Sequence, residues 1–226
     1  MGVQPFSIRQ FDLPVCESRN HLLLWKMIAV AERLCAAALL LIVLPCVILA
    51  AVIVILTSHR SPFIAHRRVG QRGRDIWVLK LRTMWDGDAA KYHVWPLVER
   101  VTSNRSPELK LRWDARVTSR FAALCRKYSL DECPQLWNVI VGDMSLVGPR
   151  PLTAPELTKY YGAHRAYLLN AKPGITGLWQ IKGRSRLTYA QRRRLDLFML
   201  RKWSLGLYLF VLTATIPRVV SGENAW

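Results

Sequence analysis

Hydrophobic residues fill one long uninterrupted stretch near the start of the chain. From Leu34 to Leu56, 23 consecutive residues carry no charge. At about 1.5 Å per residue, a helix of this length covers roughly 34 Å, enough to enter or cross a bilayer. The stretch is too long and starts too late for a secretory signal peptide. The pattern therefore predicts a membrane segment.

Pro45 lies at the midpoint of this segment, where its missing N–H and bulky ring predict a break or kink. Basic residues flank the segment on both sides, namely Arg19, Lys26, Arg33, Arg60, Arg67 and Arg68. The Lys/Arg asymmetry that orients a spanning helix is therefore weak. Two interpretations stay open, a re-entrant helix-break-helix with both ends in the cytoplasm and a kinked spanning helix.

The periodicity divides the chain into three parts. Residues 1–33 form an arm that leads into an amphipathic interfacial stretch, with Trp25 and Lys26 as interface anchors. Residues 34–57 form the membrane segment, and residues 58–226 form a polar domain with further interfacial helices. The predicted fold is mainly α with a small β-hairpin, an α+β protein.

Within the polar part, residues 61–83 predict a hairpin of two strands around a glycine-containing turn. Residues 86–115 lack a clean period and are interpreted as a loop with one short helix. Helical patterns follow at 116–127, 131–141, 154–169 and 188–202. The last is either an amphipathic helix on an anionic bilayer or a surface helix packed on the core. Residues 205–216 are apolar but too short to span, so they predict an interfacial or buried segment.

The charge narrows the choice of partners. Lys and Arg number 33 against 15 Asp and Glu, a net charge of +18. Such an excess favours nucleic acid, anionic lipid or phosphorylated substrates. No nucleic-acid-binding motif is present. The five cysteines form no C-x-x-C pair, which argues against a zinc site or a disulfide framework.

The strongest candidate site lies in residues 129–151, SLDECPQLWNVIVGDMSLVGPRP. Ser129 and Glu132 have the spacing of a capping box, which would place Asp131 in the first turn of a helix. A helix N-terminus attracts phosphate, and a carboxylate beside it could attack phosphorus. Nearby cations, Arg126, Lys127 and Arg150, would offset the substrate's charge. An ordinary helix start remains the alternative.

Two further segments carry cations. Lys80 and Arg82 alternate with leucines at the end of the second strand and could clamp a diphosphate, or form a solvated strand face. Residues 172–187, KPGITGLWQIKGRSRL, combine glycines and basic residues around Trp179. Such a loop could wrap a nucleotide or form a tight turn.

These motifs, KLRTM, SLDECPQLWNVIVGDMSLVGPRP and KPGITGLWQIKGRSRLTY, follow the hydrophobic segment in this order. Together, over residues 28–220, they resemble the monotopic phosphoglycosyl transferases. This bacterial family transfers a hexose 1-phosphate from a UDP-sugar to polyprenyl (undecaprenyl) phosphate and releases UMP. The resemblance implies a place on the cytoplasmic face of the inner membrane and a start of exopolysaccharide or O-antigen synthesis.

The resemblance also implies roles for single residues. Asp131 would be the nucleophile of an Asp-Glu dyad with Glu132, forming a covalent sugar-phosphate intermediate, with Mg²⁺ bound near Asp131. The implied substrate-binding residues are Lys80, Arg126, Arg150, Gly183 and Arg184, joined by Arg82 from the strand pattern. Pro45 would mark the break of a re-entrant hairpin.

Two other functions remain open. Asp86, Gly87 and Asp88 form a D-x-D sequence, as in metal-dependent glycosyltransferases, although the same residues are typical of a turn. The basic charge also fits a non-enzymatic, membrane-associated module that binds anions.

Overall fold

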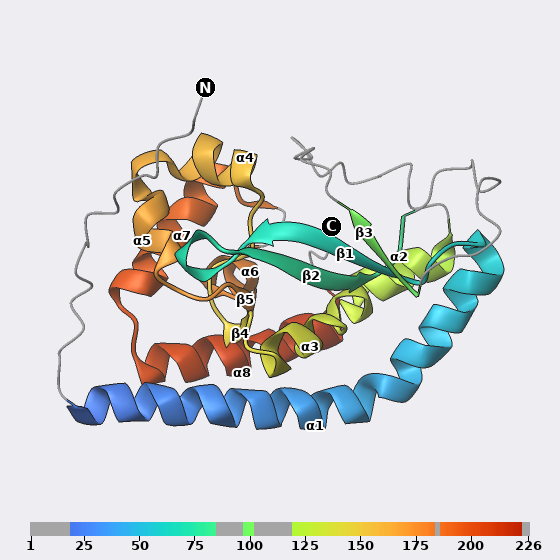
Figure 1. The fold of residues 1–226 in the computed structure, drawn as a ribbon, viewed down its shortest axis with the longest axis horizontal. Coiled ribbons are helices and arrows are strands. Elements are labelled where there is room, and N and C mark those ends of the chain that lie inside the picture. The colour runs from blue at the N-terminus through green and yellow to red at the C-terminus, as the bar shows by residue number, and fades with distance from the viewer. Residues whose placement is uncertain (1–18, 85–96, 102–118, 184–185, 223–226) are drawn as a thin grey trace.

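The computed structural model describes residues 19–84, 97–101, 119–183 and 186–222. One long helix runs along the lower side of a body made of short helices and two small sheets (Figure 1). Helices predominate, and the sheets have three strands and two strands. The expected α+β class is confirmed.

The long helix α1 extends from Arg19 to Ser58, 40 residues that include Pro45. The interruption expected at Pro45 is therefore absent, and the helix instead bends in its second half, where Pro45 lies (Figure 1). Proline removes one backbone hydrogen bond, and the flanking turns keep theirs. From Leu23 to Ser58, α1 is long and apolar enough to cross a membrane.

Both halves of α1 pack against the same body. Before Pro45, Glu32 accepts hydrogen bonds from the Leu146 backbone at 3.0 Å and from the Tyr208 hydroxyl at 2.6 Å. After Pro45, small residues such as Ala50 are buried in a cluster with Leu81. Small side chains allow this close approach of the helix to its neighbours. The bend thus keeps α1 in contact with the body along most of its length.

The predicted hairpin is confirmed. Strands β1 (Phe63–Val69) and β2 (Asp75–Leu81) pair in antiparallel fashion around the turn η1 (Gln71–Gly73). A third strand, β3 (Val98–Val101), runs parallel to β1 at the edge of the sheet. The interpretation of residues 86–115 as a loop with one short helix was wrong for residues 98–101. Their sequence, VERV, has two adjacent charges and lacks the apolar-polar alternation of a strand.

Two predicted helices are divided in the structure. The first, at 131–141, consists of a 3₁₀ turn and a short α-helix. The second, at 154–169, changes direction at Gly162, whose φ of 46° lies in the left-handed region. The elements are α2 (Arg120–Lys127), η2 (Leu130–Glu132), α3 (Gln135–Ile140), α4 (Ala154–Glu156), η3 (Leu157–Tyr161), η4 (Gly162–His164) and α5 (Arg165–Leu169).

The remaining elements complete the body. They are β4 (Ser145–Val147), β5 (Gly174–Thr176), α6 (Leu178–Lys182), α7 (Tyr189–Arg201) and α8 (Leu205–Ser221). Strands β4 and β5 pair in parallel and lie above α8 (Figure 1). A capping box between Thr188 and Gln191 starts α7, which buries Leu197, Met199 and Leu200. This helix therefore packs on the core along one face.

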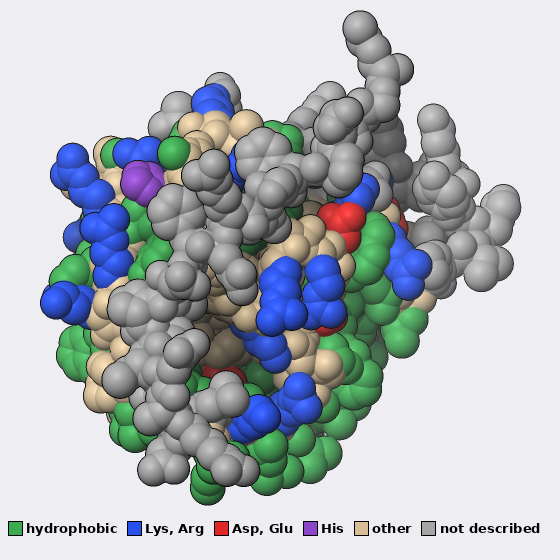
Figure 2. Space-filling view, turned by 60° about the vertical axis from the view of Figure 1, so that its left-hand side comes forward, with side chains coloured by type: hydrophobic (Ala, Val, Ile, Leu, Met, Phe, Trp, Pro, Cys, Tyr) green, Lys and Arg blue, Asp and Glu red, His purple; other side chains and the backbone are tan. Residues whose placement is uncertain are grey.

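Helices α1 and α8 present an apolar surface. Their exposed side chains include Leu34, Leu41, Ile42, Leu49, Leu56, Phe210, Ile216 and Val220. In Figure 2, hydrophobic side chains line the lower edge of the molecule, and Lys and Arg side chains gather above them. A large exposed apolar surface on a protein marks a membrane or protein contact. With the long apolar helix, this surface fits a membrane-associated protein.

Candidate active site

Asp131 and Glu132 lie in η2, the single 3₁₀ turn between α2 and α3. Ser129 adopts a left-handed conformation, with φ of 57°, and its side chain makes no capping hydrogen bond. The predicted capping box is therefore wrong, and Asp131 does not lie in the first turn of an α-helix. The tight turn instead exposes two adjacent carboxylates beside β2.

Glu132 is held by two cations that come from distant segments. Lys80 Nζ at the end of β2 lies 2.7 Å from Glu132 Oε1, and Arg150 Nη1 lies 3.6 Å from the same oxygen. All three side chains are 21–29% exposed. Ion pairs that are partly buried are screened less by solvent than surface pairs. The structure thus brings together three of the predicted site residues.

The position of Arg150 depends on a close approach of two backbones. The Gly148 N–H donates to Thr176 O at 2.9 Å, and the Gly174 N–H donates to Pro149 O at 2.8 Å. A Cβ on Gly174 would lie 2.1 Å from Gly148 N, so only glycine fits there. The motifs V-G-P-R-P and K-P-G-I-T-G are therefore packed against each other, and their contact fixes the start of the Arg150 segment.

The surroundings of Lys80 are strongly positive. Burial and the positive charges of Arg68, Lys80 and Arg82 lower the pKa of His66 to about 4. Burial also lowers the pKa of Arg68, and the charge of Arg150 adds to this effect. Burial disfavours charge of either sign, and Glu156 partly offsets the effect on Arg68, but the contributions of Arg68, Lys80, Arg82 and Arg150 favour the binding of an anion such as a phosphate.

The other predicted residues differ in their placement. Arg126 lies in the last turn of α2. Its carbonyl accepts a hydrogen bond at 3.2 Å from the N–H of Ser129, which lies two residues before Asp131. Arg82 is 5% exposed, donates to Ser61 O at 2.7 Å and pairs with Glu99, so it ties β3 to the hairpin. Its role in substrate binding stays a prediction.

The nucleotide-binding segment is described only in part. Gly183 caps the C-terminal end of α6, and its N–H donates to Trp179 O at 3.2 Å. Arg184 lies outside the described residues, as do Asp86, Gly87 and Asp88. The roles predicted for these residues stay predictions.

A stack of arginines and aromatic rings lies beside Arg150. The Arg150 and Arg192 guanidinium carbons lie 5.9 and 4.8 Å from the ring centroid of Trp179. Arg192 also lies 5.0 Å from the Tyr189 ring, which stacks on Tyr160 at 3.7 Å. Cation–π contacts of this kind hold a guanidinium in a fixed place while leaving its N–H groups available. Arg192 is therefore a candidate site residue, on a helix for which the sequence left open a place on the bilayer or on the core.

Asp196 is a second residue that the sequence analysis missed. It is fully buried on α7, one turn after Arg192, and accepts from the Tyr161 hydroxyl at 2.6 Å. Burial raises the pKa of Asp196 to about 7, against the lowering effects of the Tyr161 hydrogen bond, Arg150 and Arg192. The sequence shows only that Asp196 lies four residues after Arg192 on a predicted helix, and this spacing alone does not predict burial.

The dyad places two adjacent carboxylates where a metal ion could bind. In the described part of the chain, no three His, Cys, Asp or Glu side chains converge in a way that could hold a metal ion. Mg²⁺ commonly uses one or two carboxylates together with substrate phosphates and water. Adjacent carboxylates in a basic site fit this mode, in which the substrate supplies the other ligands.

The sequence profile of the bacterial sugar transferases matches residues 24–222, so the chain belongs to this family. It is 40% identical over 167 residues to the exopolysaccharide production protein ExoY of Rhizobium meliloti, covering 74% of this chain and 73% of that protein. It is also 40% identical to a UDP-galactose-lipid carrier transferase of Erwinia amylovora, and the match covers 74% of this chain and 35% of that protein. A UDP-glucose:undecaprenyl-phosphate glucose-1-phosphate transferase of Xanthomonas campestris is 34% identical, and the match covers 76% of this chain and 34% of that protein. The expected class of enzyme, a phosphoglycosyl transferase, is confirmed.

Proposed function

We propose that the protein transfers a hexose 1-phosphate from a UDP-sugar to polyprenyl phosphate and releases UMP. The observation that carries this proposal is the carboxylate pair of η2, with Glu132 held between Lys80 and Arg150 in a basic site. The names of the relatives, which specify UDP-galactose, UDP-glucose and undecaprenyl phosphate, support the substrate classes. The similarity to the exopolysaccharide production protein ExoY supports a product that starts an exopolysaccharide, and the family resemblance extends this proposal to glycans of the O-antigen type.

The chemistry would proceed in two displacements at one phosphorus atom. In the first, a carboxylate oxygen of Asp131 bonds to the phosphorus that carries the sugar, and the bond from that phosphorus to UMP breaks. In the second, a phosphate oxygen of the lipid attacks the same phosphorus. The acyl-phosphate bond then breaks, and Asp131 returns as a free carboxylate.

The cations have a defined task in both displacements. Two anions, the carboxylate and the diphosphate, must approach each other, and Lys80 and Arg150 offset their repulsion. Arg126 is a third candidate cation, at the end of α2 close to η2. Mg²⁺, held by Asp131 and the donor's phosphates, would supply further charge neutralisation when bound.

The membrane arrangement is part of the proposal. Contacts with one catalytic body before and after Pro45 favour a re-entrant helix over a spanning one, because the body lies on one side of the membrane. We place that body on the cytoplasmic face of the bacterial inner membrane, where UDP-sugars are available. The charge of +18 would attract anionic lipid to the same face.

The covalent route is tested by omitting the acceptor. When enzyme, Mg²⁺ and a UDP-sugar labelled in the sugar are mixed, we expect label to stay on the protein and a UMP burst equal to the enzyme concentration. A panel of UDP-sugars identifies the donor, with UDP-glucose or UDP-galactose expected to give the largest burst. If no adduct forms while complete turnover is fast, Asp131 is not a nucleophile.

The topology is tested by cysteine labelling in intact cells. Cysteines placed singly at Asn20 and Arg60, in a chain without native cysteines, should both resist a membrane-impermeant maleimide until the inner membrane is permeabilised. A periplasmic protein with one cysteine is the positive control. Labelling of one of the two positions in intact cells would establish a spanning helix.

The remaining alternatives make different expectations. A D-x-D glycosyltransferase would depend on Asp86 and Asp88 and would tolerate replacement of Asp131. A non-enzymatic anion-binding module would release no UMP, and its affinity would fall steeply with salt. Both are excluded if the label is retained on the protein and depends on Asp131.

A further inference from the structure

An apolar groove of about 300 Å³ lies between α1, α3, β5 and α8. Its walls include Leu39 of α1, Leu136 of α3 and Val219 of α8. Two threonines also line it, but Thr176 Oγ1 and Thr215 Oγ1 bond to each other at 2.7 Å. Thr215 in addition donates to Val211 O at 2.7 Å. The groove therefore offers an occupant no free polar side chain, and it suits a hydrocarbon.

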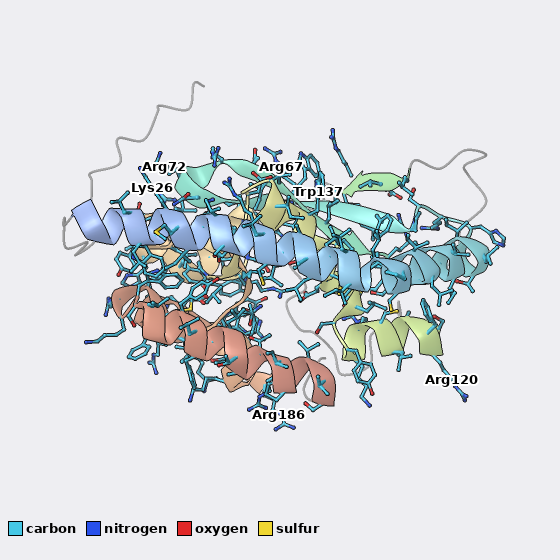
Figure 3. The ribbon with its side chains drawn as sticks, turned by 90° about the horizontal axis from the view of Figure 1, so that it is seen from below. Lys26, Arg67, Arg72, Arg120, Trp137 and Arg186 are labelled. Carbon is cyan, nitrogen blue, oxygen red and sulfur yellow. The ribbon has the colours of Figure 1, made fainter. Side chains whose placement is uncertain are left out.

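The groove is continuous with the apolar surface of α1 and α8. Its rim residues Leu39, Ile216 and Val220 are 40%, 63% and 70% exposed and belong to that surface. Seen from below, α1 and α8 lie close at their N-terminal ends and diverge toward the C-terminal end of α8 (Figure 3). A hydrocarbon chain in the surrounding lipid can thus enter the groove without crossing water.

The walls of the groove are connected along the chain, and by one contact, to the segments around the dyad. Leu136, in its wall, follows Glu132 by four residues. At the end of α8, Gly222 touches Lys127, since a Cβ on this glycine would lie 2.7 Å from Lys127 Cγ. Lys127 is the neighbour of Arg126 at the end of α2. Two walls of the groove therefore lead to the segments that flank Asp131.

We infer that this groove binds the first isoprene units of the lipid acceptor and delivers its phosphate to Asp131; this rests on the proposed function. At about 30 Å³ per heavy atom, by comparison with liquid water, the groove holds on the order of ten atoms. That number corresponds to two isoprene units of five carbons. The apolar walls bind the chain, and the basic residues near Asp131 bind its phosphate.

Filling the groove tests the inference, because the two displacements can be measured separately. We expect Val219→Trp to raise the KM for polyprenyl phosphate at least about tenfold, since the indole would occupy the space of one or two isoprene units. The UMP burst without acceptor should stay within about twofold of wild type. Leu209→Trp, on the same helix but outside the groove, is the matched control and should change neither quantity.

Val219→Phe provides a smaller filling variant if the tryptophan disturbs folding, which thermal unfolding reveals. Acceptors of one, two and more isoprene units give a second measurement. Wild type should prefer two or more units, and the filled variants should lose this preference. An unchanged KM for polyprenyl phosphate in a folded, filled variant overturns the inference. An equal fall in the rates of both displacements also overturns it, because the groove would then hold a structural phospholipid chain. Failure of wild type to give a burst would instead contradict the proposed function.

Discussion

Asp131→Asn is expected to abolish both UMP release and product formation, with a fall of more than about 10³-fold in each. The amide is a poor nucleophile, and without the first displacement no adduct reaches the lipid. The pair of Lys80 and Glu132 is left in place. The 3₁₀ turn of η2 tolerates asparagine, so thermal unfolding should match wild type.

Asp143→Asn is the matched control for this variant. Asp143 is a partly buried acidic residue in the turn after α3 and lies outside the site. It should retain the burst and the labelled adduct, which Asp131→Asn should lack. Turnover by Asp131→Asn at the wild-type rate would reduce Asp131 to a structural or Mg²⁺-binding residue. Glu132 variants are less informative, because they leave Lys80 and Arg150 without their shared carboxylate.

Local patterns carried the predictions that were confirmed. The strands of residues 61–83 follow from alternation and a glycine turn, and the apolar run of α1 follows from composition alone. The motif order around Asp131 identified the family before any geometry was known. The strands and the apolar run each lie in one continuous segment, and each motif is itself continuous, although the three motifs together extend from Lys80 to Tyr189.

The rest depends on contacts that no local pattern encodes. Lys80 and Glu132 are 52 residues apart, and their pairing replaces the capping box that the local spacing predicted for Ser129. Gly174 is fixed by the backbone of Gly148, which only the parallel pairing of β4 and β5 brings near.

The orientation of α7 could not be derived from its sequence either. Its run of arginines fits either a helix on the bilayer or a helix packed on the core. In the structure Arg192 lies against Trp179, and Asp196 is buried. A helix with arginines on several faces does not reveal which of them meets the core. Only the position of α6 beside α7 decides this.

Lys80→Met should slow the first displacement by about 10²- to 10³-fold, the loss typical of removing one preorganised donor from a transition-state site. Methionine keeps most of the apolar stem and removes the charge, so packing changes little. Glu132 would lose Lys80 and keep Arg150 at 3.6 Å, and the donor's diphosphate would meet one cation fewer. The burst rate and the KM for the UDP-sugar are the quantities to measure.

Arg67→Met on the neighbouring strand is the control, because Arg67 pairs with Asp75 where both side chains are about half exposed. Ion pairs between solvent-exposed side chains contribute little to stability, so this variant should keep its burst rate and its thermal stability. Lys80→Arg restores the charge with a different shape and should recover part of the lost rate. If Lys80→Met kept the wild-type burst rate, or if Lys80→Arg recovered none of the lost rate, Lys80 would hold Glu132 in place without acting on the phosphate. If the burst rate falls when the charge at position 80 is removed and recovers when it is restored, Lys80 assists the approach of the two anions. This role would explain why the carboxylate pair of η2 lies beside the end of β2.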